Sequence, residues 1–157
     1  MKGCIYMKHS EKAAELFAKG YNCSQAVFAA FCDVTGIDEE TSLKLSSSFG
    51  GGMGRMREVC GAVSGMFMVA GILYGYSDTD PKSKGAHYEL IQNLANKFKE
   101  KNHDTIICRS LLAGIKADSK PTPAKRDEQY YKVRPCVKFV MDAAEILDEM
   151  ILEKSVL

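Results

Sequence analysis

The sequence predicts an all-α fold, a single-domain bundle of six to seven helices around a glycine-rich central helix. Apolar residues recur at helical spacing along most of the 157 residues, and capping residues mark where successive helices begin. Strand signals are nearly absent, and no repeat occurs at a fixed period. We expect one helical domain over residues 1–157, in which about residues 115–131 form a charged, proline-containing loop that could be mobile.

Each predicted helix has its own boundary signals. Asn22, Asp38 and Asp104 are expected to be N-cap residues. Asp80 followed by Pro81 marks the start of a long helix, because proline is favoured at the first helical position. The predicted helices span residues 10–19, 23–34, 39–48, 60–74, 81–101, 105–113 and 136–154.

The predicted central helix contains glycine at four-residue spacing. The pairs are Gly61 with Gly65 and Gly71 with Gly75. Each interior glycine costs about 1 kcal/mol of helix stability relative to alanine, but it lets a neighbouring backbone approach closely. We therefore expect this helix to be packed on several sides, with Cys60 in its first turn.

Composition and charge limit the classes of protein that the chain can belong to. It is 46% apolar and 26% charged, with a formal net charge of +1, which is typical of a soluble globular protein. We expect no nucleic-acid partner and no stable membrane insertion, because the net charge is small and the apolar part of the central segment is short. The N-terminus lacks the apolar run of a signal peptide, so a cytoplasmic location is expected. There, cysteines are expected to be free, ligating or redox-active.

Four of the six cysteines are predicted to lie at or near helix starts. They are Cys23, Cys60, Cys108 and Cys136. Free N–H groups and the helix dipole favour an anion at this position, which lowers the pKa of a thiol. Nearby arginines should act in the same direction, and they are Arg55, Arg57, Arg109 and Arg134. We expect the four cysteines to form one site, although cysteine is also a common small buried residue.

The two other cysteines are expected to lie outside this site. Cys32 is nine residues beyond Cys23 in the same predicted helix, so the two should face opposite ways, and Cys32 is expected in the core. Cys4 lies near the terminus and is expected to be incidental. The sequence contains no CxxC, which removes the local signatures of a thioredoxin-type pair, a zinc ribbon and c-type haem attachment.

The glycine-rich loop FGGGMGR, which precedes Cys60, is expected to line the cysteine site. It lacks the lysine and hydroxyl residue of a P-loop, and it does not follow a strand as a dinucleotide-binding loop does. We expect its glycines to permit a close approach to the cysteines. Anion binding by its backbone N–H groups is the less favoured alternative. The predicted site-lining residues are Gly51, Gly52, Gly54, Arg55 and Gly61.

Over nearly the full chain, the order of the cysteines resembles that of redox-active proteins of the C-GCAxxG-C-C type. The matching stretches are GYNCSQAV at Cys23, CGAVSG from Cys60, CRSLL from Cys108 and RPCVKFV at Cys136, together with the loop FGGGMGR. This resemblance implies a small helical bacterial protein whose four cysteines are thought to be redox-active. A related region accompanies haem modules in split-Soret-type cytochromes, but this chain has no CxxCH, so no haem is expected.

The leading hypothesis is that the four cysteines bind an iron–sulfur cluster for electron transfer or redox sensing, since four thiolates suffice for a two-iron or a four-iron cluster. The alternative is a metal-free thiol–disulfide oxidoreductase, in which Cys60 attacks and one of the other three cysteines resolves. A structural four-cysteine zinc site is a third hypothesis, and buried cysteines with a function located elsewhere are a fourth. The sequence does not decide whether the protein is an enzyme, and it names no redox partner. The glycine-rich helix and the apolar last helix could support a homodimer.

Overall fold

The computed structural model describes residues 7–157, and the all-α class is confirmed. The described residues form no strand, only an isolated antiparallel bridge between Val59 and Ile107. None of their helices combines the length and the apolar character needed to span a membrane. The elements are α1 (His9–Ala18), α2 (Cys23–Ala30), α3 (Cys32–Thr35), α4 (Glu39–Ser46), the 3-10 helix η1 (Ser47–Phe49), α5 (Gly50–Met53), α6 (Gly61–Tyr74), α7 (Pro81–Lys101), α8 (Cys108–Leu111), α9 (Glu128–Val133) and α10 (Cys136–Ser155).

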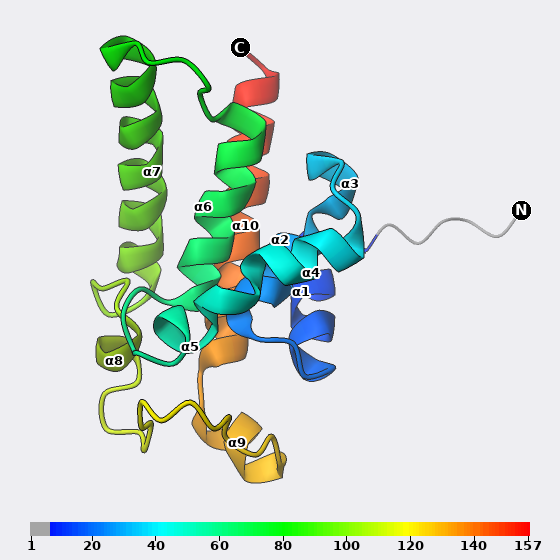
Figure 1. The fold of residues 1–157 in the computed structure, drawn as a ribbon, viewed down its shortest axis with the longest axis vertical. Coiled ribbons are helices and arrows are strands. Elements are labelled where there is room, and N and C mark those ends of the chain that lie inside the picture. Colours follow the sequence, from blue (N-terminus) through cyan, green and yellow to red (C-terminus); the bar gives the residue numbers. More distant parts are fainter. Residues whose placement is uncertain (1–6) are drawn as a thin grey trace, which may run out of the picture.

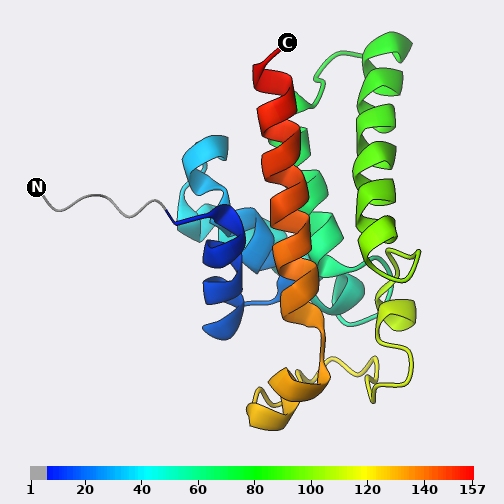
Figure 2. The ribbon, with the colours of Figure 1, turned by 180° about the vertical axis from the view of Figure 1, so that it is seen from behind.

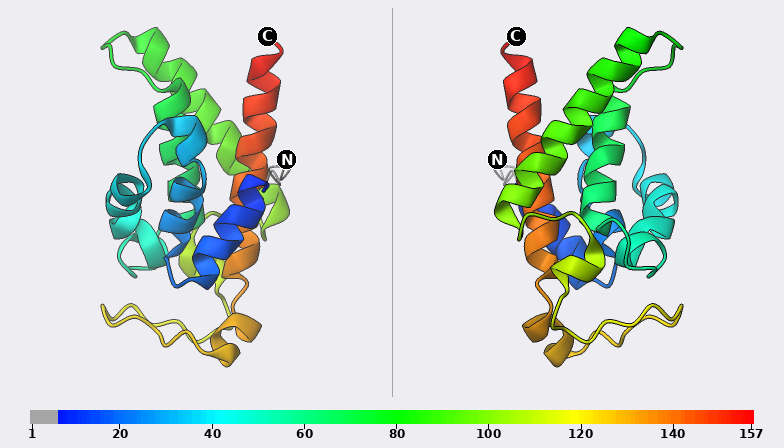
Figure 3. Two further views of the ribbon diagram at one scale, coloured as in Figure 1. Left: turned by 90° about the vertical axis from the view of Figure 1, so that its right-hand side faces the viewer. Right: turned by 90° about the vertical axis from the view of Figure 1, so that its left-hand side faces the viewer.

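Helix α6 is the central helix of the bundle (Figure 1). It packs against α2, α10 and α7, and α1 packs against α2 and α10. Seen from behind, α10 lies over α6 (Figure 2). The side views show that α7 and α10 move apart towards the C-terminal end of α10 (Figure 3). Side chains buried among these helices include Phe28, Val63, Met66 and Val140. The prediction of a central helix packed on several sides is confirmed.

Two of the three glycines in α6 permit a close helix contact. A Cβ atom on Gly65 would lie 2.8 Å from the carbonyl oxygen of Ser24, and one on Gly61 would lie 3.1 Å from the Ser24 nitrogen. The expectation of close approach is therefore confirmed here, and the neighbour is the backbone of α2. It is wrong at Gly71, where an added Cβ would meet nothing within 4 Å. Gly75 is the C-cap of α6, and its N–H donates to the carbonyl oxygen of Gly71 at 2.9 Å.

The helix predicted over residues 23–34 is interrupted at Phe31. The backbone there has φ −102° and ψ 19°, so α2 ends before Phe31 and α3 begins after it. The Phe31 ring is fully buried and stacks on His9 at a centroid distance of 4.1 Å. Packing of one aromatic side chain thus coincides with the break, and Cys23 and Cys32 lie on different helices.

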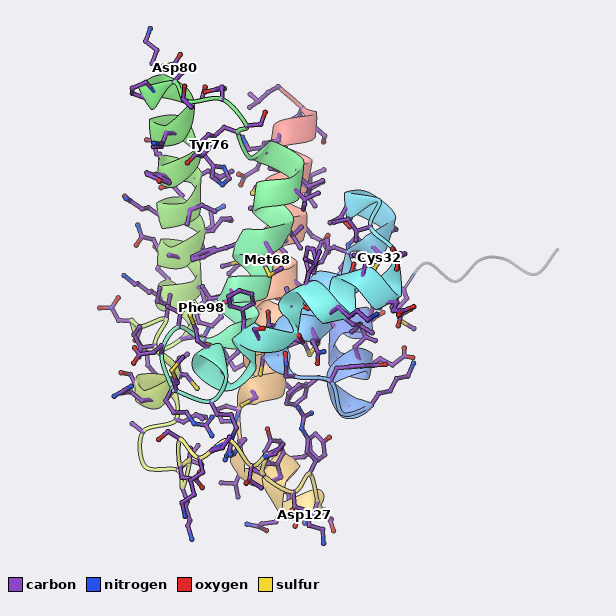
Figure 4. All side chains as sticks on the ribbon, in the orientation of Figure 1. Cys32, Met68, Tyr76, Asp80, Phe98 and Asp127 are labelled. Carbon is purple, nitrogen blue, oxygen red and sulfur yellow. The ribbon has the colours of Figure 1, made fainter. Side chains whose placement is uncertain are left out.

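Cys32 lies apart from the other described cysteines. It is at the start of α3, beside α4, as the labelled side chain shows (Figure 4). Its Sγ donates a hydrogen bond to Ser42 Oγ at 3.4 Å, and the side chain is only partly buried rather than deep in the core. The prediction for Cys4 falls outside the described residues.

Two predicted segments differ from the structure in their extent. The helix predicted over residues 105–113 is the single turn α8, and Asp104, its predicted cap, has φ 56° and lies outside it. Helix α9 occupies the end of the loop predicted over residues 115–131, with Asp127 as its N-cap. Helices α3, α5 and α9 have only four to six residues. This is too short for apolar periodicity to reveal them. Mobility of the loop stays a prediction.

Replacing Gly65 with alanine should destabilise the protein, because the added Cβ would force α2 and α6 apart. Overpacking of this kind costs about 1–3 kcal/mol. Gly71→Ala is the matched control in the same helix, where open space and the higher helix propensity of alanine should raise stability by up to about 1 kcal/mol. Urea unfolding measures both effects. Equal stability of the two variants would contradict the close contact.

Candidate functional site

The four cysteines singled out in the sequence line one cavity of about 60 Å³. Cys23, Cys108 and Cys136 are the first residues of α2, α8 and α10, and Cys60 is the N-cap of α6 rather than part of its first turn. All but Cys23 are buried, and Cys23 is partly buried. The starts of four helices therefore meet at the end of the bundle where α5, α8 and α9 lie (Figure 1).

Backbone pairing holds the segments before α6 and α8 together. The N–H of Cys60 donates to the carbonyl oxygen of Ile106 at 2.8 Å, and the N–H of Cys108 donates to that of Glu58 at 2.6 Å. The bridge between Val59 and Ile107 lies between these two bonds. This pairing fixes two of the cysteines relative to each other. It involves too few residues to give a strand signal, so sequence reasoning missed it.

The predicted site-lining residues divide between two cavities. Gly51, Gly52 and Gly61 line the cysteine cavity, whereas Gly54 and Arg55 line a neighbouring pocket. A Cβ atom on Gly52 would lie 2.6 Å from the Cβ of a cysteine, Cys108, and one on Gly61 would lie 3.2 Å from the Cβ of Cys23. These two glycines therefore give the close approach to the cysteines that the sequence predicts.

The glycine-rich loop and the two residues after it also contain left-handed residues that are not glycine. Met53, Arg55 and Arg57 have φ values of 64°, 68° and 62°. A left-handed conformation costs roughly 1–2 kcal/mol for such a residue. The fold holds the loop in place by bonds from the N–H groups of Arg57 and Glu58 to the carbonyl oxygens of the glycines before them. The result is that the Arg57 side chain is buried beside the cysteines.

Three arginines make the wall of the cysteine cavity positively charged. They are Arg57, Arg126 and Arg134, and no carboxylate lines the cavity. The guanidinium of Arg126 donates to the carbonyl oxygens of Phe17 and Tyr21 at 2.8 and 2.9 Å. That of Arg134 lies over the ring of Tyr130, 4.8 Å from its centroid.

Two residues of this wall, Arg126 and Tyr130, fall in the segment that the sequence predicts as a loop. Sequence reasoning gave Arg126 no role, and no local signal identifies it. Arg109, which was expected to act on the cysteines, instead pairs with Glu58 at 3.0 Å, and both side chains are exposed. Of the four predicted arginines, Arg57 and Arg134 line the cysteine cavity and Arg55 and Arg109 do not, while Arg126 supplies a charge that the sequence does not indicate.

The pKa values of the thiols differ in direction. A hydrogen bond from Cys23 holds the pKa of the Cys136 thiol below its usual value, and nearby arginines add to this effect, with Arg134 the largest. The same hydrogen bond and burial raise the pKa of Cys23. Burial raises the pKa of Cys60 to about 12, and it raises the pKa of Cys108 as well. The expectation of a low pKa at all four helix starts is therefore wrong for three of them. Burial outweighs the helix end at Cys60 and Cys108, and at Cys23 the hydrogen bond to Cys136 acts together with burial.

The cysteines share a cavity without forming a preassembled metal site. All five cysteines within residues 7–157 are free thiols. In this part of the chain, no three His, Cys, Asp or Glu side chains are placed to hold a metal ion. The structure thus brings the four predicted residues together, while their chemical role stays a prediction.

The fold and the site define a small all-α protein with four cysteines from separate helices at one cavity. A family model described as "Putative redox-active protein (C_GCAxxG_C_C)" matches residues 21–150, and the chain belongs to this family. The resemblance noted in the sequence is thereby confirmed. Comparison with curated proteins and with solved structures finds no match.

Gly52→Ala should disturb the cysteine cavity as well as the stability of the protein. Gly52 has φ 72°, and its new Cβ would also lie 2.8 Å from the Cα of Arg57. Gly36→Ala is the matched control, because Gly36 has φ 73° but open space around it. The stability of Gly36→Ala should fall only by the cost of the left-handed conformation, about 1–2 kcal/mol. Chemical denaturation should show a larger loss of stability for Gly52→Ala, and thiol labelling of Cys108 should be faster in this variant. Equal losses of stability in the two variants would contradict the contact.

Proposed function

We propose that the four-cysteine cavity is a redox centre that binds an iron–sulfur cluster for electron transfer or redox sensing. The observation that carries this proposal is the meeting of four free cysteines from separate helices at one cavity with three arginines in its wall. A bound cluster supplies one-electron chemistry. The chain's own residues contribute four thiol ligands, positive charge and exclusion of water.

The donor set supports a cluster. The lining residues include four thiols but no carboxylate and no imidazole, and thiolates are the soft ligands that iron–sulfur clusters take. Glycine occupies the two wall positions, Gly52 and Gly61, where a Cβ would crowd Cys108 and Cys23. The absence of a side chain at these two glycines therefore leaves space beside the two cysteines.

The charges at the site also support this proposal. Ligation requires thiolates, so iron binding must release protons from the thiols whose pKa values are raised. The positive charge of Arg57, Arg126 and Arg134 offsets part of the negative charge that then develops. Positive charge beside a cluster favours its reduced state and raises its reduction potential.

A structural zinc site receives less support. Zinc takes its four ligands at one ion, and no three candidate side chains within residues 7–157 have that placement. A four-iron cluster attaches each cysteine to a different iron atom, and a two-iron cluster attaches two cysteines to each, so the four ligands lie farther apart than those of a single ion.

Serine at any one of Cys23, Cys60, Cys108 or Cys136 should lower the iron and acid-labile sulfide that copurify with the protein. Each substitution removes one ligand from a four-ligand centre. Cys32→Ser is the control, because Cys32 lies outside the cavity. The measurement is iron and sulfide analysis with a visible spectrum, on protein purified without oxygen. Equal iron content in all five variants would argue against the assembled site.

A reversible disulfide between Cys23 and Cys136 is the second candidate. It is favoured because both thiols line the cysteine cavity and their pKa values shift in opposite directions, raised at Cys23 and lowered at Cys136. In this scheme the Cys136 thiolate attacks an external disulfide and displaces one thiolate. The Cys23 thiol then gives up its proton and attacks the Cys136 sulfur of the mixed disulfide. This forms the Cys23–Cys136 disulfide and displaces the second thiolate of the substrate, so two electrons pass to the substrate. Cys60, predicted from the sequence as the attacking group, is less suited because burial raises its pKa to about 12.

Oxidised glutathione, added to reduced metal-free protein, should form the Cys23–Cys136 disulfide before any other. Peptide mapping by mass spectrometry identifies the linked pair, and Cys32 serves as the internal control that stays free. Cys136→Ser should abolish the product. A first disulfide that includes Cys60 or Cys108 would count against this candidate, as would iron and sulfide bound in matching stoichiometry by all four cysteines.

A further inference from the structure

A second pocket, with a volume of about 280 Å³, adjoins the cysteine cavity. Arg57, Arg126 and Arg134 line both, and Arg55 lines the second pocket alone. Prolines and an alanine at positions 121–124 also line it. They belong to the segment that runs across the end of the bundle in the side views (Figure 3).

The second pocket is strongly positive. Four arginines line it, and no aspartate or glutamate does. The carboxylate nearest to them is that of Asp118, 3.7 Å from Arg55 Nη1, and it is 56% exposed. The bonds of Arg126 go to the carbonyl oxygens of Phe17 and Tyr21, which are neutral acceptors. A concave surface with this charge concentrates anions.

Arg57, which lines both cavities, has a donor atom without a partner. The side chain is 6% exposed, its Nε donates to the carbonyl oxygen of Asp118 at 3.0 Å, and its Nη1 lies 3.8 Å from Cys108 Sγ. Its Nη2 is buried and has no hydrogen-bond partner. A buried charged donor without an acceptor is costly. An acceptor supplied by a ligand would remove that cost.

We propose that the arginine-lined pocket binds a small oxyanion, either free or as the carboxylate or phosphate group of a small molecule. Guanidinium groups recognise both through paired hydrogen bonds. The volume of the pocket is that of a small ligand site. Because three arginines lie in both walls, the anion binds directly beside the cysteines. This inference goes beyond the redox function, and it holds for either redox chemistry.

Isothermal titration of the full chain, purified without oxygen, with sodium phosphate and with sodium acetate tests the proposal. We expect saturable binding of at least one of the two anions that weakens as ionic strength rises. Arg55→Gln should weaken it by about tenfold or more, because a charge-assisted hydrogen bond is lost. Arg55→Lys, which keeps the charge, should restore part of the affinity. Arg109→Gln is the control, since this exposed arginine lines neither cavity.

No saturable binding of either anion would overturn the proposal, and so would equal weakening by Arg55→Gln and Arg109→Gln. Equal loss in Arg55→Lys and Arg55→Gln would also contradict it, because charge would then not be the cause. Circular dichroism establishes that each variant is folded. Titration of Cys136→Ser separates this proposal from the redox function, because anion binding should persist when the cysteine centre is incomplete.

Discussion

The contact between α2 and α6 is the constraint on which the site depends. The two backbones approach closely only because Gly61 and Gly65 lack a Cβ where α2 passes over them. That approach places Cys23, at the start of α2, beside Cys60, at the N-cap of α6. Half of the cysteine cavity is therefore set by the packing of the two helices that form the centre of the bundle. The other two cysteines, Cys108 and Cys136, lie at the starts of α8 and α10. The cavity therefore exists only in the complete fold.

Burial and positive charge act in opposite directions on the thiols of this cavity. Burial favours the neutral thiol and prevails at Cys60, which no arginine contacts closely enough to reverse the effect. At Cys136 the hydrogen bond from Cys23 and the surrounding arginines prevail, and they hold the pKa of the thiol below its usual value. The cavity therefore holds thiols of unequal acidity beside uncompensated positive charge. This is a suitable environment for a centre whose negative charge changes during its reaction.

Signals that act within a few residues made much of the fold predictable. Asn22 accepts a hydrogen bond from the N–H of Gln25 at 2.9 Å, and Asp80 accepts one from Lys82 at 2.9 Å, as expected for N-caps. The common place of four cysteines at helix starts led to the expectation of one site, but their convergence at one cavity depends on the complete fold. Arg126 could not be predicted in the same way, because its bond to Phe17 joins residues 109 apart. Local patterns locate helix starts, but they do not show which distant charges the fold brings to them.

Arg57 joins the two cavities through one guanidinium. Its Nη1 lies 3.8 Å from the sulfur of Cys108, its Nη2 has no hydrogen-bond partner, and the residue lines both cavities. An anion in the arginine-lined pocket would interact with the same positive charge that stabilises negative sulfur in the cysteine cavity. Negative charge on the sulfur atoms would in turn weaken the attraction of the anion. Because coupling between two binding equilibria is reciprocal, the state of the cysteines and the occupancy of the arginine-lined pocket would each shift the other through this side chain.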